Sequence, residues 1–217
     1  MSDTDTRIDL RKQFDLHFTG GERKAVAFLK KHSWLLIPNV TARSLEKGYV
    51  GCYAEVHLAD EYRADFAVYY KESSELHWEF IEVQAPDAKV LSGINTRYAS
   101  QFSEALHQVE SWDGWFRRNS HAAEARFPNS THARAFRIVI GRSDSMSVQE
   151  REALQDARSG RRRIRTFCWF YDKLDRFDID EIDRLESLGI ARTHSELRKD
   201  KASLLKLLSS RIDRRYA

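Results

Sequence analysis

The strongest strand signals in the chain are two runs of aromatic and β-branched residues at 61–70 and 77–86. The polar segment 71–75 between them is typical of a turn, so the pattern predicts two neighbouring strands joined as a hairpin. Alternate side chains of a strand share a face. The second run therefore has Trp78, Phe80, Glu82 and Gln84 on one face, and Glu79, Ile81 and Val83 on the other.

The first run has the same alternation. We expect Asp65 to face the same side of the sheet as Glu82 and Gln84, together with Ala67 and Tyr69. Two carboxylates and an amide would then converge, which is the oxygen-rich setting that a hard divalent cation prefers. A plainer interpretation makes these acids solvated strand residues. Their apolar neighbours favour burial, and a buried charge is costly unless it is paired or binds a metal.

The apolar pattern predicts elements on both sides of this hairpin. Thr19 to Glu22 has the form of a capping box that opens a helix, and 1–18 is expected to be an arm or a short leading helix. Irregular chain and then a strand are expected over 40–58. Helical spacing of apolar residues, starting with Tyr98, predicts a long helix at 97–118.

The second half continues the alternation of strands and helices. We expect a polar loop at 119–133, a strand at 135–140, a helix from the capping box at Ser147 to about Arg158, and a strand at 164–170. Strand, helix and strand in succession indicate an α/β fold with a mixed or parallel sheet. Beyond 178, apolar positions predict one or two helices that pack on the core or on a second subunit. The expected division is an arm at 1–18, a domain at 19–175 and a helical extension at 176–217.

Composition narrows the class of protein. The 217 residues are 41% hydrophobic and 32% charged, with no apolar run near the ~20 residues of a membrane span. The first residues lack the features of a signal peptide, so we expect a cytoplasmic protein with no membrane partner and no sensor domain ahead of the core. Cys52 and Cys168 are isolated, and we expect them to be buried free thiols.

The net charge of +3 is small, but basic residues cluster at 192–217 and in a compact run. The run consists of Arg161, Arg162, Arg163 and Arg165. Such clusters can neutralise phosphates, although solvated surfaces have the same composition. Glu22 is similarly open to two interpretations. It either caps the backbone at Thr19 or, on a helix face with Val26 and Leu29, reaches toward the carboxylates.

Several stretches together resemble a known family. Residues 61–66 (EYRADF) and 80–86 (FIEVQAP) resemble the core of PD-(D/E)XK nucleases, specifically the domain of the Shedu family of bacterial anti-phage proteins. The likeness continues through Gly21-Glu22 with Phe28-Leu29, residues 108–112 (QVESW) and residues 138–142 (IVIGR), and covers roughly 20–175. One departure is clear, because Gln84 stands where the motif has lysine.

The resemblance implies a restriction-endonuclease-like fold, with a central mixed sheet flanked by helices, and a metal-dependent DNA endonuclease. Asp65 and Glu82 would hold Mg²⁺ or Mn²⁺, with the Val83 carbonyl and Glu22 as further ligands. Gln84 would position water or bind a metal through its amide oxygen. Because two carboxylates and a neutral amide tolerate a second cation more readily than a site with lysine, we expect Gln84→Lys to lower activity.

Other residues would support this site, and other functions stay open. Gln108 would stand beside the metal ligands, and Arg97 would meet a phosphate. The chain lacks the sequence motifs of a phosphate-binding loop, a dinucleotide-binding turn, a zinc-protease helix and a serine nucleophile elbow. Of the chemistries considered, this leaves metal-dependent hydrolysis. The alternatives are a catalytically inactive DNA-binding or assembly subunit and an RNA-directed nuclease of the same fold. We also expect a homodimer or a larger homo-oligomer.

Overall fold

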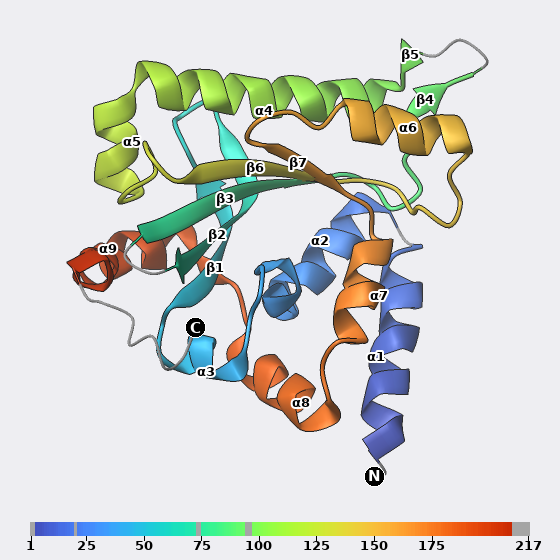
Figure 1. Cartoon of the computed structure of the whole chain (residues 1–217), viewed down its shortest axis with the longest axis horizontal. Coiled ribbons are helices and arrows are strands. Elements are labelled where there is room, and N and C mark those ends of the chain that lie inside the picture. Colours follow the sequence, from blue (N-terminus) through green and yellow to red (C-terminus); the bar gives the residue numbers. More distant parts are fainter. Residues whose placement is uncertain (1–2, 20, 73–74, 94–96, 210–217) are drawn as a thin grey trace.

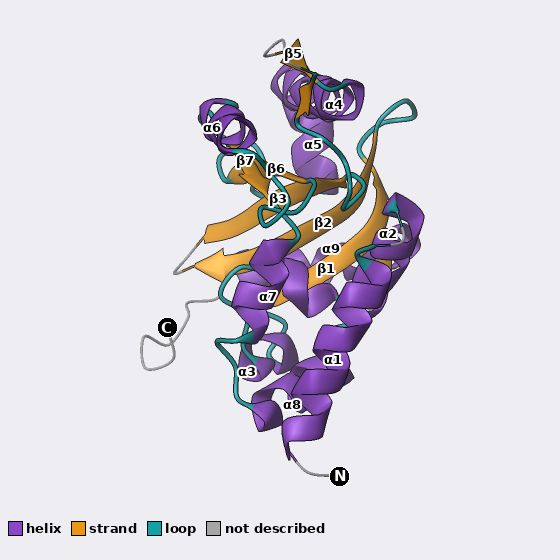
Figure 2. Cartoon of the chain, turned by 90° about the vertical axis from the view of Figure 1, so that its right-hand side faces the viewer, coloured by secondary structure: helices purple, strands orange, loops and turns teal. Residues whose placement is uncertain are grey.

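A central mixed sheet lies between two layers of helices (Figures 1 and 2). The structure, a computed structural model, describes residues 3–19, 21–72, 75–93 and 97–209. The six strands of the sheet run in the order β7-β6-β3-β2-β1-β8. They are β1 (Val50–His57), β2 (Arg63–Glu72), β3 (Glu75–Val83), β6 (Arg134–Val139), β7 (Arg162–Arg165) and β8 (Arg192–Thr193). A separate two-stranded ribbon pairs β4 (Leu91–Ser92) with β5 (Arg97–Tyr98).

The expected hairpin forms the middle of the sheet. Strands β2 and β3 pair antiparallel, with Ala67 opposite Phe80 and Tyr69 opposite Trp78. Positions 73–74 of the expected turn lie outside the described residues. Strand β3 pairs with β6 in parallel, and β6 pairs with β7 in parallel. The predicted α/β class with a mixed sheet is confirmed, while the finer restriction-endonuclease-like assignment stays a prediction.

One face of the sheet carries an apolar cluster that includes Trp78, Phe80, Trp112 and Leu154. The helices that contribute to this cluster are α4 (Ser100–Arg118), α5 (Ser120–Arg126), α6 (Val148–Asp156) and α9 (His194–Ser209). Helix α4 lies along the sheet (Figure 1) because its apolar residues recur at helical spacing. This confirms the predicted long helix, which begins three residues later than expected.

The opposite face carries a second cluster that includes Ile81, Val83, Phe14 and Phe18. The helices that contribute to it are α1 (Asp3–His17), α2 (Glu22–Lys31), the 3-10 helix η1 (Ser33–Leu36), α3 (Ala42–Glu46), α7 (Cys168–Leu174) and α8 (Ile179–Leu188). Figure 2 shows this layer on the other side of the sheet from α4 and α6. Trp78 and Phe80 on one face, and Ile81 and Val83 on the other, confirm the alternation predicted for β3.

Three local predictions were wrong. Helix α2 begins after Gly21 without a side-chain cap, and the Thr19 hydroxyl donates to the Asp15 carbonyl at 2.9 Å, so the predicted capping box is absent. Gly20 lies outside the described residues. The expected loop at 119–133 contains helix α5. The last parallel strand ends at Arg165, and the aromatic run after it forms helix α7 rather than strand.

The positions of Tyr98 and Cys168 differ from the prediction. The capping box predicted at Ser147 is confirmed. Tyr98, expected in the long helix, lies in β5 and is 39% exposed. Cys52 is buried, whereas Cys168 is only half-buried, and both are free thiols. The predicted capping box at Ser147 is present, with the Ser147 hydroxyl accepting from the Glu150 amide.

Segments near both ends of the chain pack on the core. Phe14 and Phe18 of the leading segment are buried, and α8 and α9 bury Ile182 and Leu204. The apolar stripes of the last two helices are therefore used within the chain. No helix in the described part of the chain combines the length and apolar character needed to cross a bilayer.

Candidate functional site

Asp65 and Glu82 lie on adjacent strands at the same end of the central hairpin. Phe66 pairs with Ile81, so continuing the antiparallel register by one residue brings Asp65 opposite Glu82. The Asp65 Oδ2 atom accepts a hydrogen bond of 2.8 Å from the backbone amide of Val83. Glu82 is 7% exposed and Asp65 is half-buried. The predicted convergence of the two acids is therefore what the structure contains.

Two glutamine amides hold the Glu82 carboxylate. Gln84 Nε2 donates to Glu82 Oε1 at 3.1 Å, and Gln108 Nε2 donates to Glu82 Oε2 at 2.9 Å. Gln84 continues the line of β3, because its backbone amide donates to the Val139 carbonyl at 2.8 Å. Gln108 comes from the middle of α4. Each Glu82 oxygen thus has its own neutral donor, from a different element.

Burial and neighbouring carboxylates raise the pKa values of both acids. Desolvation, together with Asp65 and Glu22, raises the pKa of Glu82 to about 9. Desolvation raises the pKa of Asp65 to about 6, opposed by its hydrogen bond from the Val83 amide and reinforced by Glu22. Both shifts favour the protonated form of each acid when no cation is bound.

Another buried acid, Glu79, shows what a structural carboxylate looks like in this protein. Glu79 is fully buried on the opposite face of β3, where Arg137 Nε donates to its Oε1 at 3.1 Å. Among the described residues, by contrast, no lysine, arginine or histidine lies within ion-pair distance of Asp65 or Glu82. Arg63 lowers the pKa values of both acids from a greater distance, and Lys30 does so for Asp65, so the charge of the pair is only partly offset and no side chain forms an ion pair with it.

The donors around the pair fit a divalent cation that accepts oxygen ligands. Within residues 3–19, 21–72, 75–93 and 97–209, no three acidic, histidine or cysteine side chains form a ready metal site. A cation would therefore depend on Asp65 and Glu82 together with neutral oxygens, such as the Val83 carbonyl. Two desolvated carboxylates with raised pKa values gain most from such an ion, because it replaces their missing counter-charge.

Glu22 stands close enough to raise the pKa values of both acids, but it is exposed. It is the first residue of α2 and forms no cap, so the structural role expected for it is absent. From this position Glu22 could bind a metal ion at Asp65 and Glu82 through a water molecule or after a change of rotamer, rather than as a direct ligand in its present rotamer.

The four basic residues expected to bind nucleic acid are divided by the alternation of β7. Arg162 Nη1 donates to Glu110 Oε1 at 2.7 Å, and Arg161 lies 3.8 Å from Asp113, both acids of α4. Arg163 and Arg165 face the other way and line a cavity beside α7. Arg97 is exposed in the β4–β5 ribbon. The arginines thus do not form one continuous surface.

A comparison of the chain with models of known protein families identifies its family. The family model described as Shedu protein SduA, C-terminal, matches residues 21–174. The chain belongs to this Shedu family. The match runs from the first residue before α2 to the end of α7, and it includes Asp65, Glu82, Gln84 and Gln108. Membership suggests a protein of a Shedu defence system. No curated protein and no solved structure matches the chain.

Sequence reasoning did not single out the buried cluster of Glu79, Arg137 and Lys173. The signal was present, because Glu79 interrupts an apolar run between Trp78 and Phe80 in the same way that Glu82 interrupts the run after Ile81. What the sequence could not supply was its partner, since Arg137 lies 58 positions away on β6.

Proposed function

We propose that this Shedu protein is a metal-dependent DNA endonuclease of the PD-(D/E)XK type, acting in phage defence. The observation that carries the proposal is the Asp65–Glu82 pair, two desolvated carboxylates that form no ion pair with a cationic side chain among the described residues. Family membership supports the defence role. A purely structural acid pair would be expected to have an arginine partner, as Glu79 does.

The residues of the site would have two roles, to bind the metal ion and to orient the two carboxylates. Asp65, Glu82 and the Val83 carbonyl would hold Mg²⁺ or Mn²⁺, with Glu22 at the outer edge. A bound divalent cation would polarise the phosphate and acidify a bound water. Gln108 and Gln84 keep the Glu82 carboxylate in one orientation through their amide donors. The Val83 amide does the same for Asp65.

A plasmid-nicking assay tests the proposal. We expect relaxed or linear product from supercoiled plasmid with Mg²⁺ or Mn²⁺, and none with chelator. Asp65→Asn and Glu82→Gln should each lower the rate by about 10²-fold or more while the protein still binds DNA, since each removes a charged ligand. Asp87→Asn is the matched control, because Asp87 is an exposed acid shortly after β3. Equal rates for all three variants would refute the proposal.

A second candidate is a catalytically inactive subunit that binds DNA or assembles with other proteins. The observation that favours it is Gln84, whose amide cannot supply the positive charge of the motif lysine. Failure to cut plasmid or RNA under any divalent metal, combined with DNA binding that does not need metal, would support this candidate. Cleavage of RNA with intact plasmid would instead indicate an RNA-directed nuclease.

A further inference from the structure

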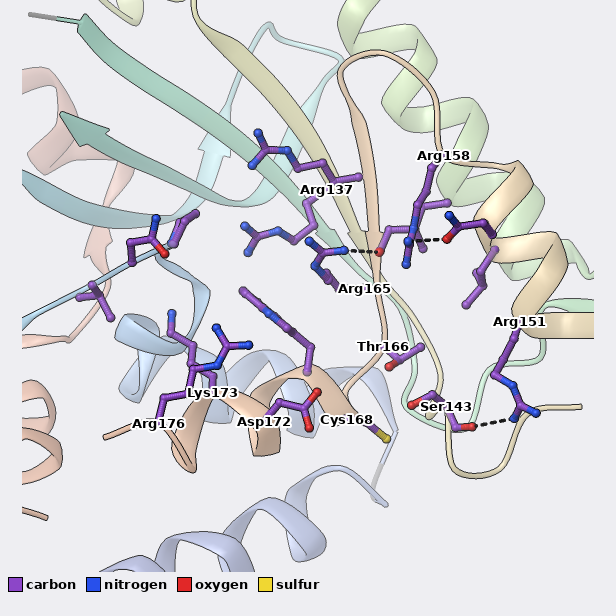
Figure 3. Close-up of a pocket in the computed structure, with 18 of the residues that line it drawn as sticks. Arg137, Ser143, Arg151, Arg158, Arg165, Thr166, Cys168, Asp172, Lys173 and Arg176 are labelled. Carbon is purple, nitrogen blue, oxygen red and sulfur yellow. Dashed lines mark hydrogen bonds between the residues drawn. The ribbon is translucent and has the colours of Figure 1, made fainter. Parts of the chain in front are cut away.

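A cavity of about 870 Å³ opens at the β7 edge of the sheet. Its walls come from α6, β7, α7 and the segment 38–41, and it includes Arg163 and Arg165 but neither Asp65 nor Glu82 (Figure 3). Seven cationic side chains and one acidic side chain, Asp172, line it. This imbalance of charge is concentrated in a concave space, and it is unrelated to the Asp65–Glu82 pair.

Two of the cations form a buried base and are already satisfied by the protein. Arg137 donates to Glu79 and to the Leu36 carbonyl, and its side chain is 3% exposed. The Lys173 ammonium donates to the carbonyls of Trp34 and Leu35 at 3.0 Å each. These groups fix the shape of the cavity without needing a ligand.

Three arginines around this base have hydrogen bonds only to neutral oxygens, and Arg165 also lies over the Trp169 ring. Arg151 Nη1 donates to the Met146 carbonyl at 2.7 Å, and Arg158 Nη1 donates to the Gln155 side-chain oxygen at 2.6 Å. Arg165 Nη1 donates to the Ile164 carbonyl at 3.4 Å. Figure 3 shows Arg158 and Arg165 side by side in the cavity.

These bonds leave most of the donors of each guanidinium available. A guanidinium has five N–H donors, and each of these bonds uses only one nitrogen. Within the described ranges, Arg151, Arg158 and Arg165 have no ion pair with a carboxylate, and the same is true of Arg176. The side chains are therefore positioned but not neutralised.

The cations of the cavity lie close enough to repel one another. Burial, and then the charges of Arg137 and Arg158, lower the pKa of Arg165. Burial, and then the charge of Arg137, lower the pKa of Lys173 well below its usual value, with Arg176 adding to the effect. Such crowding destabilises the empty cavity, and a multiply charged anion would relieve it.

We propose that this cavity binds a small polyphosphate ligand, such as a nucleoside di- or triphosphate, through Arg158 and Arg165, with Arg151 and Arg176 at its margins. Planar guanidinium groups bind phosphate oxygens in a bidentate manner, which favours arginine over lysine at such a site. The volume lies within the ~300–1,000 Å³ of small-molecule pockets and exceeds what a single phosphate fills.

The geometry favours a small ligand over a DNA backbone. The positive base, Arg137 and Lys173, is almost fully buried beneath the cavity walls, where a duplex resting on the surface cannot approach it. The other arginines of the run, Arg161 and Arg162, are paired with acids of α4 and do not extend the positive surface. A phosphodiester track would need such an extension.

Binding of ATP, pyrophosphate and inorganic phosphate to the full chain tests the proposal by calorimetry and thermal shift. The measurements are made in chelator, so that any metal at Asp65 and Glu82 plays no part. We expect saturable binding of ATP and pyrophosphate at low ionic strength, with phosphate at least about tenfold weaker. Arg158→Gln and Arg165→Gln should each weaken ATP binding by about tenfold or more.

The matched control is Arg117→Gln, which removes one exposed arginine of α4 that does not line the cavity and should bind ATP as the parent does. Thermal melts without ligand verify that each variant folds. The proposal is overturned if neither ATP nor pyrophosphate binds, or if Arg158→Gln and Arg165→Gln bind them as Arg117→Gln does. It is also overturned if short duplex DNA binds the cavity and ATP does not displace it. Loss of nuclease activity has no bearing on any of these outcomes.

Discussion

Gln108 Nε2 lies 2.9 Å from Glu82 Oε2 and joins the middle of α4 to the end of β3. The same nitrogen lies 3.4 Å from the Arg63 carbonyl, at the start of β2. One amide thus connects the helix with both strands that carry the acid pair. A residue in this position can orient Glu82 without taking part in the chemistry.

We therefore predict that Gln108→Ala lowers plasmid cleavage by about tenfold, because Glu82 loses one of its two amide donors and becomes free to turn. Its apparent affinity for Mn²⁺ should fall as well, which a purely structural change on α4 would not produce. Rates measured over a range of Mn²⁺ concentrations verify both effects. His107→Ala, an exposed neighbour on α4, is the control. Parental rates in Gln108→Ala would contradict the positioning role.

A second prediction separates the two roles of Asp65. Asp65→Ala removes the acceptor for the Val83 amide and should cost about 1–3 kcal/mol of stability, because a buried donor is left unsatisfied. Asp65→Asn keeps an oxygen acceptor and loses the charge, so it should be the more stable variant. Urea denaturation in chelator gives both free energies of unfolding. Equal stability of the two variants would show that this hydrogen bond contributes nothing.

The raised pKa values predict how stability depends on pH in the absence of metal. The pKa of Glu82 rises from 4.5 to about 9 and that of Asp65 from 3.8 to about 6. From about pH 4 to about pH 9 the folded protein holds more protons on these two acids than the unfolded chain does. The free energy of unfolding therefore falls as pH rises through this range. Glu82→Gln should flatten the decline between pH 6 and 9, measured by denaturation in chelator.

Divalent metal should act in the opposite sense. Because the cation binds the ionised carboxylates, Mn²⁺ should stabilise the protein more at pH 8 than at pH 6. Melting temperatures with and without Mn²⁺ at both pH values measure this. A stabilisation that does not change with pH, or that persists in Glu82→Gln, would place the metal elsewhere.

The sequence predicted the acid pair because period-two alternation is a local property. Asp65, Ala67 and Tyr69 had to share a face, and so did Glu82 with Trp78 and Phe80, whatever surrounded them. Only the pairing register remained to be found, and apolar burial on both faces determines it. The contact from Gln108 to Glu82 was harder to predict from the sequence, because it depends on where α4 crosses the sheet.

The errors have a common physical origin, which is that local signals compete with tertiary packing. The aromatic run at 167–170 has strand propensity, yet Phe167 and Phe170 pack against Phe18 of the leading segment, and the chain turns into α7. Thr19 has the form of a helix cap, but its hydroxyl bonds back to α1. The cavity beside β7 was beyond prediction, because its cations come from elements far apart in the sequence.

Assembly provides a further prediction. Ile182 and Leu204 are buried within the chain, so the stripes once expected to face a second subunit are not available. A homodimer is still expected on functional grounds, since one site cuts one strand. The candidate contacts are the exposed Leu188, the last residue of α8, and Ile190 just beyond it. Light scattering of the parent and of Ile190→Lys tests this. If the parent is a monomer, the predicted homodimer is wrong. If Ile190→Lys is still a dimer, the interface does not include Ile190.

The last prediction concerns Gln84, where the motif has lysine. Its amide nitrogen, rather than its oxygen, faces Glu82 at 3.1 Å, so a lysine at this position could donate the same hydrogen bond and add a full charge. That charge would lower the pKa of Glu82 by favouring its ionised form. In place of the fall in activity expected from the sequence, we therefore expect Gln84→Lys to keep or increase cleavage and to shift the rising limb of the pH–rate profile to lower pH. Gln84→Leu, which donates nothing, should cleave about tenfold more slowly. If Gln84→Lys loses activity while Gln84→Leu keeps it, the ammonium repels a cation near Glu82, and residue 84 does not act as a donor.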